Sequence, residues 1–147
     1  MQTATLLAAF CLLTGTGAAP AIGQELISMK IRLTIDGKPI EATLLDSGAA
    51  RDFLSLLPLT LTLEDYASTE KISYLPRKLS TAGAPAGVDP APGDIAYYAP
   101  WGNLAIFYKD AGYAKGLVKL GRIDSGVEAL SVRGSLKVTI DRMNSAR

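Results

Sequence analysis

The chain has 147 residues, a net charge of +1 and no histidine. This length suits a single domain with one core, and the near-neutral charge gives no electrostatic basis for binding nucleic acid. Without histidine the chain lacks the commonest general base and metal ligand, and a Ser-His-Asp triad is excluded. We therefore expect neither a cofactor nor a metal site.

The N-terminal segment has the pattern of an export signal. A short apolar run, too short to span a bilayer as a helix, is followed by small residues that end at Gly23. We predict a signal peptide over residues 1–23; it would carry away the only cysteine, Cys11, and leave residues 24–147 as a domain without thiols. The protein would then be periplasmic or secreted, without stable membrane association. In the alternative interpretation, translation starts at Met29 and the protein is cytoplasmic.

Alternation of apolar and polar side chains dominates the rest of the chain. Ile31, Leu33 and Ile35 predict a half-buried strand, and Asp36-Gly37 follows as a strong hairpin signal, because a type I′ turn needs positive φ at both central residues. Alternation, or aromatic and β-branched content, predicts further strands over residues 40–44, 59–64, 71–75, 94–98, 103–108, 117–123 and 136–141. About eight strands can close into a barrel that side chains fill. We predict a mainly β fold, a closed barrel of about eight strands with two short helices.

The last predicted strand mirrors the first. Its apolar residues, Leu136, Val138 and Ile140, alternate with polar ones in the same way as those of the first strand. Pairing the two strands would remove two exposed sheet edges at once, so we expect the barrel to close there.

Both predicted helices have a structural interpretation. In the first, Ser47 can cap a short amphipathic helix that Pro58 ends. In the second, Ser125 and Glu128 form a capping-box pattern in which each side chain would satisfy a backbone donor of the other residue. We expect Val127 and Leu130 of this second helix to face the barrel and cover one of its ends.

Two neighbouring segments point to a binding site. Residues 76–93 are too rich in proline and glycine for regular structure, and such long loops are usually functional or mobile. Residues 94–108 form two strands joined by a Pro-Trp-Gly-Asn turn, which contains Trp101, the only tryptophan. Tyr97 and Tyr98 point to opposite faces of one strand, so at most one of them can face a pocket.

Several segments resemble the bacterial cyclophilin-like family of small β-barrel proteins. They are Tyr-Leu-Pro-Arg-Lys-Leu at residues 74–79, Gly-Ala-Pro-Ala-Gly at residues 83–87, the aromatic block at residues 94–108 and Gly-Leu-Val-Lys-Leu-Gly-Arg-Ile at residues 116–123. The resemblance covers most of the predicted mature chain and implies a cyclophilin-like barrel. It assigns no general function.

The resemblance also bears on isomerase activity. Cyclophilins that isomerise prolyl bonds use an arginine to stabilise the twisting amide and a glutamine to hold the peptide. The matching segments here, residues 71–76 and 102–106, contain neither, although Arg77 follows the first of them. Because electrostatic stabilisation is the main catalytic contribution available to such an enzyme, the resemblance implies a barrel without the isomerase signature.

The candidate site lies between the loop of residues 76–93 and the aromatic turn. Trp101 either packs across the barrel rim or stacks on a ligand, and Asn103 is either a turn former or a ligand contact. Arg77 either is a solvated charge or binds a planar acceptor of a ligand through its guanidinium group. The binding residues that we predict are Tyr74, Arg77, Tyr98, Trp101, Asn103 and Tyr113.

Three functions remain open from the sequence. The first is a non-catalytic barrel that binds a small molecule or an extended peptide. The second is a divergent peptidyl-prolyl cis-trans isomerase that acts on exported proteins and uses Arg77. The third is an interaction module that exposes Trp101 and Tyr113 to a partner protein. A concave cleft with Arg77 pointing inward would favour the second, and a flat exposed patch would favour the third.

Overall fold

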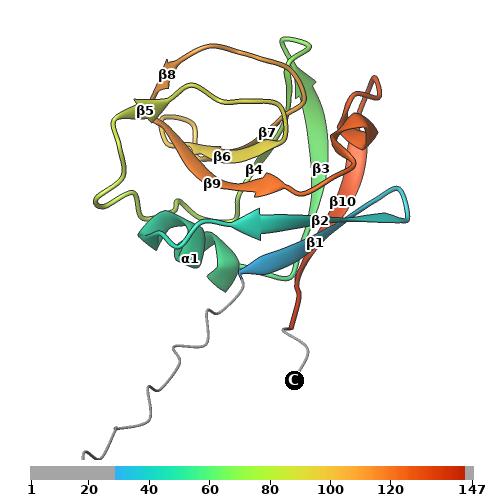
Figure 1. Ribbon diagram of the computed structural model, residues 1–147, viewed down its shortest axis with the longest axis horizontal. Coiled ribbons are helices and arrows are strands. Elements are labelled where there is room, and N and C mark those ends of the chain that lie inside the picture. Colours follow the sequence, from blue (N-terminus) through green and yellow to red (C-terminus); the bar gives the residue numbers. More distant parts are fainter. Residues whose placement is uncertain (1–28, 145–147) are drawn as a thin grey trace, which may run out of the picture.

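The computed structural model describes residues 29–144, so the predicted signal peptide lies outside the described residues. Eight strands form a closed barrel in the spatial order β1-β10-β3-β4-β7-β6-β9-β2, and β5 pairs with β8 in a separate two-stranded ladder (Figure 1). The strands are β1 (Lys30–Ile35), β2 (Lys38–Leu44), β3 (Leu59–Tyr66), β4 (Glu70–Tyr74), β5 (Gly87–Val88), β6 (Asp94–Tyr98), β7 (Asn103–Phe107), β8 (Ala114–Lys115), β9 (Leu117–Ile123) and β10 (Leu136–Arg142). The predicted mainly β barrel is therefore confirmed.

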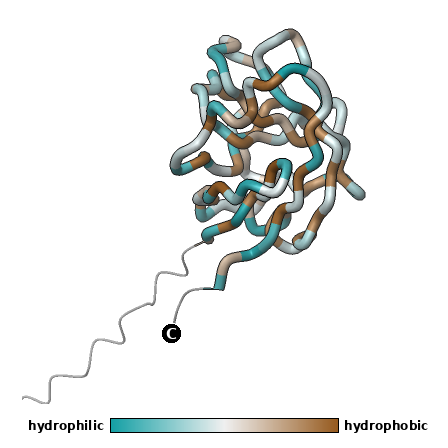
Figure 2. Tube along the Cα trace, turned by 90° about the vertical axis from the view of Figure 1, so that its right-hand side faces the viewer, coloured by the Kyte–Doolittle hydropathy of each residue, from teal (hydrophilic) through white to brown (hydrophobic). Residues whose placement is uncertain are grey.

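The first hairpin forms as the sequence predicts. Asp36 and Gly37 have φ values of 48° and 80°, the left-handed conformations that the tight turn needs. The turn sets the antiparallel register in which Leu33 lies opposite Ile40. Hydrophobic and hydrophilic residues alternate along the strands (Figure 2), so that one set of side chains fills the barrel.

Strand β10 closes the barrel. It pairs antiparallel with β1, where Leu33 lies opposite Ile140 and Ile35 opposite Val138, and its other edge pairs with β3. Val138 is fully buried and Ile140 nearly so. The predicted pairing of the last strand with the first is confirmed, and it leaves neither strand with a free edge.

The predicted first helix is also confirmed. Helix α1 (Gly48–Ser55) begins after Ser47, whose hydroxyl accepts a hydrogen bond from the Ala50 amide at 3.2 Å. Its buried face, which includes Phe53, contributes to the barrel core. No helix within residues 29–144 is long and apolar enough to cross a membrane.

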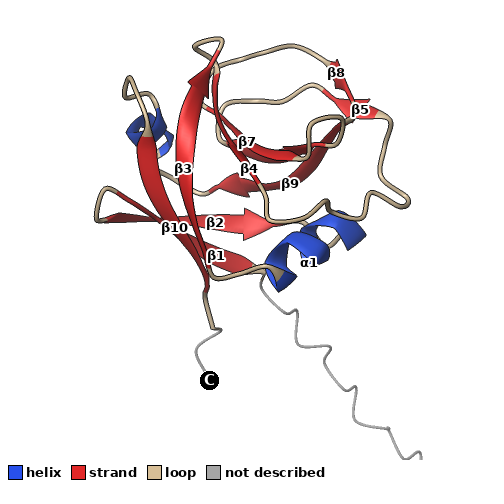
Figure 3. Ribbon diagram, turned by 180° about the vertical axis from the view of Figure 1, so that it is seen from behind, coloured by secondary structure: helices blue, strands red, loops and turns tan. Residues whose placement is uncertain are grey.

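The predicted second helix is corrected to a single 3₁₀ turn, η1 (Val127–Leu130), which lies far from α1 (Figure 3). The predicted capping box does not form: Gly126, with φ 90°, occupies the cap position, and no side chain caps the turn. The left-handed glycine moves Ser125 out of the position that a capping serine needs. Leu130 is nevertheless fully buried in the core, as expected for a residue that covers the barrel.

A buried lysine ties the β3–β4 end of the barrel to the segment before β10. Lys71 has no exposed surface; its ammonium donates to the carbonyls of Val132 at 2.6 Å and Gly134 at 2.8 Å and pairs with Asp65 at 3.2 Å. Asp65 in turn accepts a hydrogen bond from the Tyr108 hydroxyl at 2.5 Å. We refer to these five residues as the Lys71 network.

The Lys71 network changes the acidity of its members. The Tyr108 hydrogen bond, followed by the Lys71 ammonium, holds the pKa of Asp65 below its ordinary value. Burial and the neighbouring Asp65 carboxylate raise the pKa of Tyr108 to about 12. Both shifts favour an ionised Asp65 and a neutral Tyr108 at pH 7, the states in which this hydrogen bond forms.

Candidate functional site

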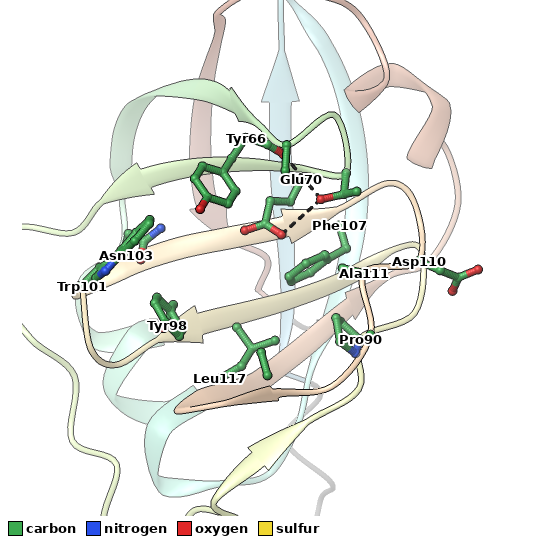
Figure 4. A pocket seen from close by; sticks show the side chains of 14 residues that line it. Tyr66, Glu70, Pro90, Tyr98, Trp101, Asn103, Phe107, Asp110, Ala111 and Leu117 are labelled. Carbon is green, nitrogen blue, oxygen red and sulfur yellow. Dashed lines mark hydrogen bonds between the residues drawn. The ribbon is translucent and has the colours of Figure 1, made fainter.

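A pocket of about 380 Å³ lies on the outer face of the barrel, between the strands and the loops that flank them (Figure 4). The barrel interior is filled by core side chains, so this site lies outside the core. The pocket is lined by Tyr66, Ala67, Thr69, Glu70, Pro90, Tyr98, Trp101, Asn103, Phe107, Asp110, Ala111, Gly112, Ala114 and Leu117. We refer to it as the outer-face pocket.

The floor of the outer-face pocket is a second, smaller apolar cluster. Ala105 and Phe107 of β7 point to the outer face because successive residues of a strand alternate, while Leu104 and Ile106 point into the barrel. Phe107, and Leu117 on the neighbouring part of β9, are both almost fully buried. The strand β7 is therefore buried along its whole length, because both of its faces are covered.

Three aromatic side chains, Tyr66, Tyr98 and Trp101, form one wall of the outer-face pocket, and we refer to them as the aromatic wall. The Trp101 ring lies 5.6 Å from the Tyr66 ring and 5.4 Å from the Tyr98 ring, at interplanar angles of 85° and 79°. These are edge-to-face contacts, a geometry in which neighbouring aromatic rings attract each other, and they stabilise the packing of the three rings. Trp101 is still 48 % exposed and Tyr66 43 % exposed, so much of the wall remains open to solvent.

Two turns position the aromatic wall. Trp101 stands in the β6–β7 turn, where the amides of Trp101 and Gly102 both donate to the Tyr98 carbonyl and Gly102 has φ 72°. Tyr66 ends β3 beside Ala67 and Ser68, whose φ values of 51° and 55° are unusual for residues with a side chain. Such strained backbone is found more often near functional sites.

Two polar side chains of the outer-face pocket, Glu70 and Asn103, stand on neighbouring strands. Glu70 reaches into the space between Tyr66 and Phe107 (Figure 4) and accepts a long 3.5 Å hydrogen bond from Thr69. Burial raises the pKa of Glu70 above its ordinary value. Asn103 is only 2 % exposed, and its Oδ1 finds no hydrogen-bond partner among the described residues. An unpaired buried acceptor costs stability.

The structure brings three of the six predicted site residues together. Tyr98, Trp101 and Asn103 all line the outer-face pocket, and Pro90 of the predicted loop lies opposite them. Tyr74 is 69 % exposed and lines a smaller neighbouring depression, of about 130 Å³, that it shares with Asn103. The aromatic turn and Pro90 of the long loop therefore border the same pocket.

The other two predicted residues lie elsewhere. Arg77 makes a bidentate pair with Asp52 of α1, at 2.7 and 3.0 Å, and is not among the lining residues. This pair, with a hydrogen bond from the Ser80 amide, lowers the pKa of Asp52 to about 2. Tyr113 is 65 % exposed and lies over Gly87, where an added Cβ would come within 2.7 Å of the tyrosine hydroxyl.

The loop of residues 76–93 is held at several points. Besides the Arg77 pair, the Leu79 amide donates to the Tyr97 hydroxyl at 3.2 Å, and β5 pairs with β8. The expectation that this loop lacks regular structure is thus corrected for Gly87–Val88, which form a short ladder. The loop supplies a fixed side of the pocket through Pro90.

The comparison with protein families decides what kind of barrel this is. The sequence profile of the Cyclophilin-like family matches residues 33–141. The chain belongs to this family. The resemblance read from the sequence is confirmed, and the match extends from β1 into β10.

Solved structures support the same fold for this cyclophilin-like chain. A hypothetical protein from Archaeoglobus fulgidus, determined in solution, matches with a TM-score of 0.58 and 18 % sequence identity, over 83 % of this chain and 100 % of the other. At that identity the likeness concerns the fold alone. A comparison with curated proteins gives no match.

Sequence reasoning missed Tyr66, Glu70 and Phe107 in this cyclophilin-like barrel. The barrel order brings β4 beside β7 and places Glu70 opposite Phe107, a pairing that separations along the chain do not reveal. Alternation in the sequence would not have found Glu70, because it favours the inner face for Ile72 and therefore for Glu70, whereas the structure buries Lys71 and leaves Glu70 on the outer face. Within residues 29–144, no three metal-ligating side chains converge.

Proposed function

We propose that this protein is a non-catalytic binding protein whose outer-face pocket takes a small molecule or a short extended peptide. The observation that carries the proposal is an aromatic wall left half open on a concave surface. Exposed aromatic rings beside an apolar floor with a few polar groups are typical of ligand sites. A ligand that covers the exposed part of these rings gains free energy from apolar burial.

The position of Arg77 bears on the isomerase alternative. An isomerase of the kind predicted needs this guanidinium free to face the prolyl amide, whereas it is paired with Asp52, and none of the described pocket-lining residues is an arginine. The concave shape also differs from the flat patch that an interaction module would present. Both observations support binding without catalysis.

The site can be tested by fragment screening with NMR. Mixtures of small acids, amines, alcohols and aromatic amides are added to ¹⁵N-labelled protein that starts at Gln24. Trp101 gives one indole signal, because it is the only tryptophan. We expect shifts confined to Trp101, Asn103 and Phe107, and lost in Tyr98→Ala. Shifts elsewhere on the barrel, or none at all, would contradict a ligand site in this pocket.

Two further measurements complete the test. A protease-coupled assay on a proline tetrapeptide should give the uncatalysed rate; fast turnover that Arg77→Ala abolishes would establish the isomerase instead. We also propose that the protein acts in the periplasm or outside the cell, on the pattern of residues 1–23. Intact mass of protein from its own host should then show Gln24 as the first residue, and a product that begins at Met29 would contradict export.

A further inference from the structure

We propose that the outer-face pocket binds an alkylammonium group, carried by a small organic amine or by a lysine side chain. This inference rests on the proposed function and names the chemistry of its ligand. It follows from three features of the pocket: the geometry of the aromatic wall, one inward carboxylate, and the charges of the lining residues.

The aromatic wall suits a cation. Trp101 stands nearly perpendicular to both Tyr66 and Tyr98, and all three residues line the same wall of the pocket. The face of an aromatic ring carries negative partial charge, and a cation within about 6 Å of it is attracted. Tyr66 and Trp101 are also nearly half exposed, which leaves surface for a ligand to cover.

Glu70 supplies the counter-charge. Its side chain reaches into the pocket beside Tyr66 (Figure 4), and it forms no ion pair with any described residue. By contrast, the carboxylates of Asp65 and Asp94 face lysine or arginine at 3.1 to 3.4 Å. A half-buried carboxylate without an ion-pair partner costs stability, as its raised pKa indicates, and groups of this kind are concentrated at functional sites.

The remaining lining residues select the same charge. The charged residues among them are Glu70 and, at the rim, Asp110, and no described lining residue is lysine or arginine. An anionic ligand would therefore meet repulsion and no cationic partner. A protonated amine brings hydrogen-bond donors as well as charge, which the Glu70 carboxylate can accept.

A charge-matched series of probes tests the inference. The probes are 2-phenylethylammonium, 2-phenylethanol and 3-phenylpropanoate, which share a ring and a short chain and differ in charge. Fluorescence of Trp101, the only tryptophan, reports binding. We expect the ammonium to bind about ten-fold more tightly than either of the others. Glu70→Gln should reduce this preference to about three-fold or less, because the ring contacts remain while the counter-charge is lost.

A matched control and a peptide arm complete the design. Glu41→Gln neutralises an exposed carboxylate on β2, outside the pocket lining, and should leave the preference unchanged. Acetyl-Ala-Lys-Ala-amide is compared with its norleucine counterpart. The affinity ratio of the lysine peptide to the norleucine peptide is compared with the affinity ratio of 2-phenylethylammonium to 2-phenylethanol. A larger ratio for the peptides points to a peptide ligand, and a larger ratio for the free probes points to a small amine. Either result supports the ammonium site.

The outcomes separate this inference from the proposed function. If all three probes bind equally at Trp101, the ammonium inference is wrong and the pocket remains a binding site. If Glu70→Gln leaves the preference intact, the assignment of Glu70 as the counter-charge is wrong. If no probe of any charge alters Trp101 fluorescence, both proposals fail. The probe series on the unchanged protein decides whether the pocket binds a ligand and whether it prefers the ammonium, so these two results do not depend on the folding of a variant.

Discussion

The Lys71 network should account for a large share of the stability of the barrel. Replacement of Lys71 by methionine keeps a flexible chain of similar length and removes the ammonium. The change leaves the carbonyls of Val132 and Gly134 without their donor and leaves Asp65 without its cation. The two ends of the network are far apart in sequence, so its loss should also loosen the segment that leads into β10.

The magnitude follows from the contacts. Hydrogen bonds from a charged donor contribute about 1.5–3 kcal/mol each, and Lys71 makes two to carbonyls. Against this, methionine does not need to be desolvated, and the Asp65 side chain is 31 % exposed, so water can solvate it. We expect a net loss of about 3 kcal/mol, and a fall in Tm of about 10 °C for a domain of this size.

Urea unfolding measures the loss, with Lys137→Met as the control because Lys137 is an exposed lysine of β10. A double-mutant cycle of Lys71→Met with Asp65→Asn isolates the ion pair, and asparagine still accepts from Tyr108. The coupling should be about 1–2 kcal/mol. The control should change the free energy of unfolding by less than about 0.5 kcal/mol. If Lys71→Met changes it by no more than that, the reasoning on the Lys71 network is wrong.

Three other predictions concern the fold. Truncation after Leu130 removes β10 and should abolish cooperative unfolding in calorimetry; an unchanged melt would make the tail an appendage. Gly121→Ala places a methyl 2.4 Å from the Thr43 carbonyl oxygen, so we expect a loss of about 3 kcal/mol in urea unfolding, and a neutral result would contradict the close approach of β9 to β2. The Arg77 partner holds the pKa of Asp52 near 2, so the stability that this pair contributes should be present above about pH 4 and lost as the pH falls towards 2. The Tm of Asp52→Asn should lack this part of the acid dependence, and identical pH profiles would count against the pair.

Local patterns predicted the barrel well because they act over a few residues. The Asp36-Gly37 turn and the Ser47 cap depend only on their neighbours, and alternation decides which face of a strand is buried. The capping box of Ser125 failed for an equally local reason, since the next residue is a glycine in a left-handed conformation. The sequence alone does not indicate whether the capping box of Ser125 or a left-handed conformation of Gly126 prevails at this turn.

The candidate site was only partly predictable because its residues meet through the barrel order. Trp101 was found from its turn, whereas Glu70 lies in the pocket because β4 pairs with β7. Arg77 was expected to face a ligand, but it pairs with Asp52, which lies 25 residues earlier and on a helix. A long-range ion pair of this kind leaves no pattern in a single sequence.

A crystal structure of the protein with saturating 2-phenylethylammonium tests the outer-face pocket most directly. The expected result is a ligand whose nitrogen lies within hydrogen-bond distance of the Glu70 carboxylate and within about 6 Å of a ring of the aromatic wall. A second cavity, of about 200 Å³, lies between α1 and the loop at Gly83 and is the alternative binding site within the same molecule. A ligand bound there instead, or bound in the outer-face pocket with its nitrogen directed away from Glu70 into solvent, would contradict the proposed ammonium site.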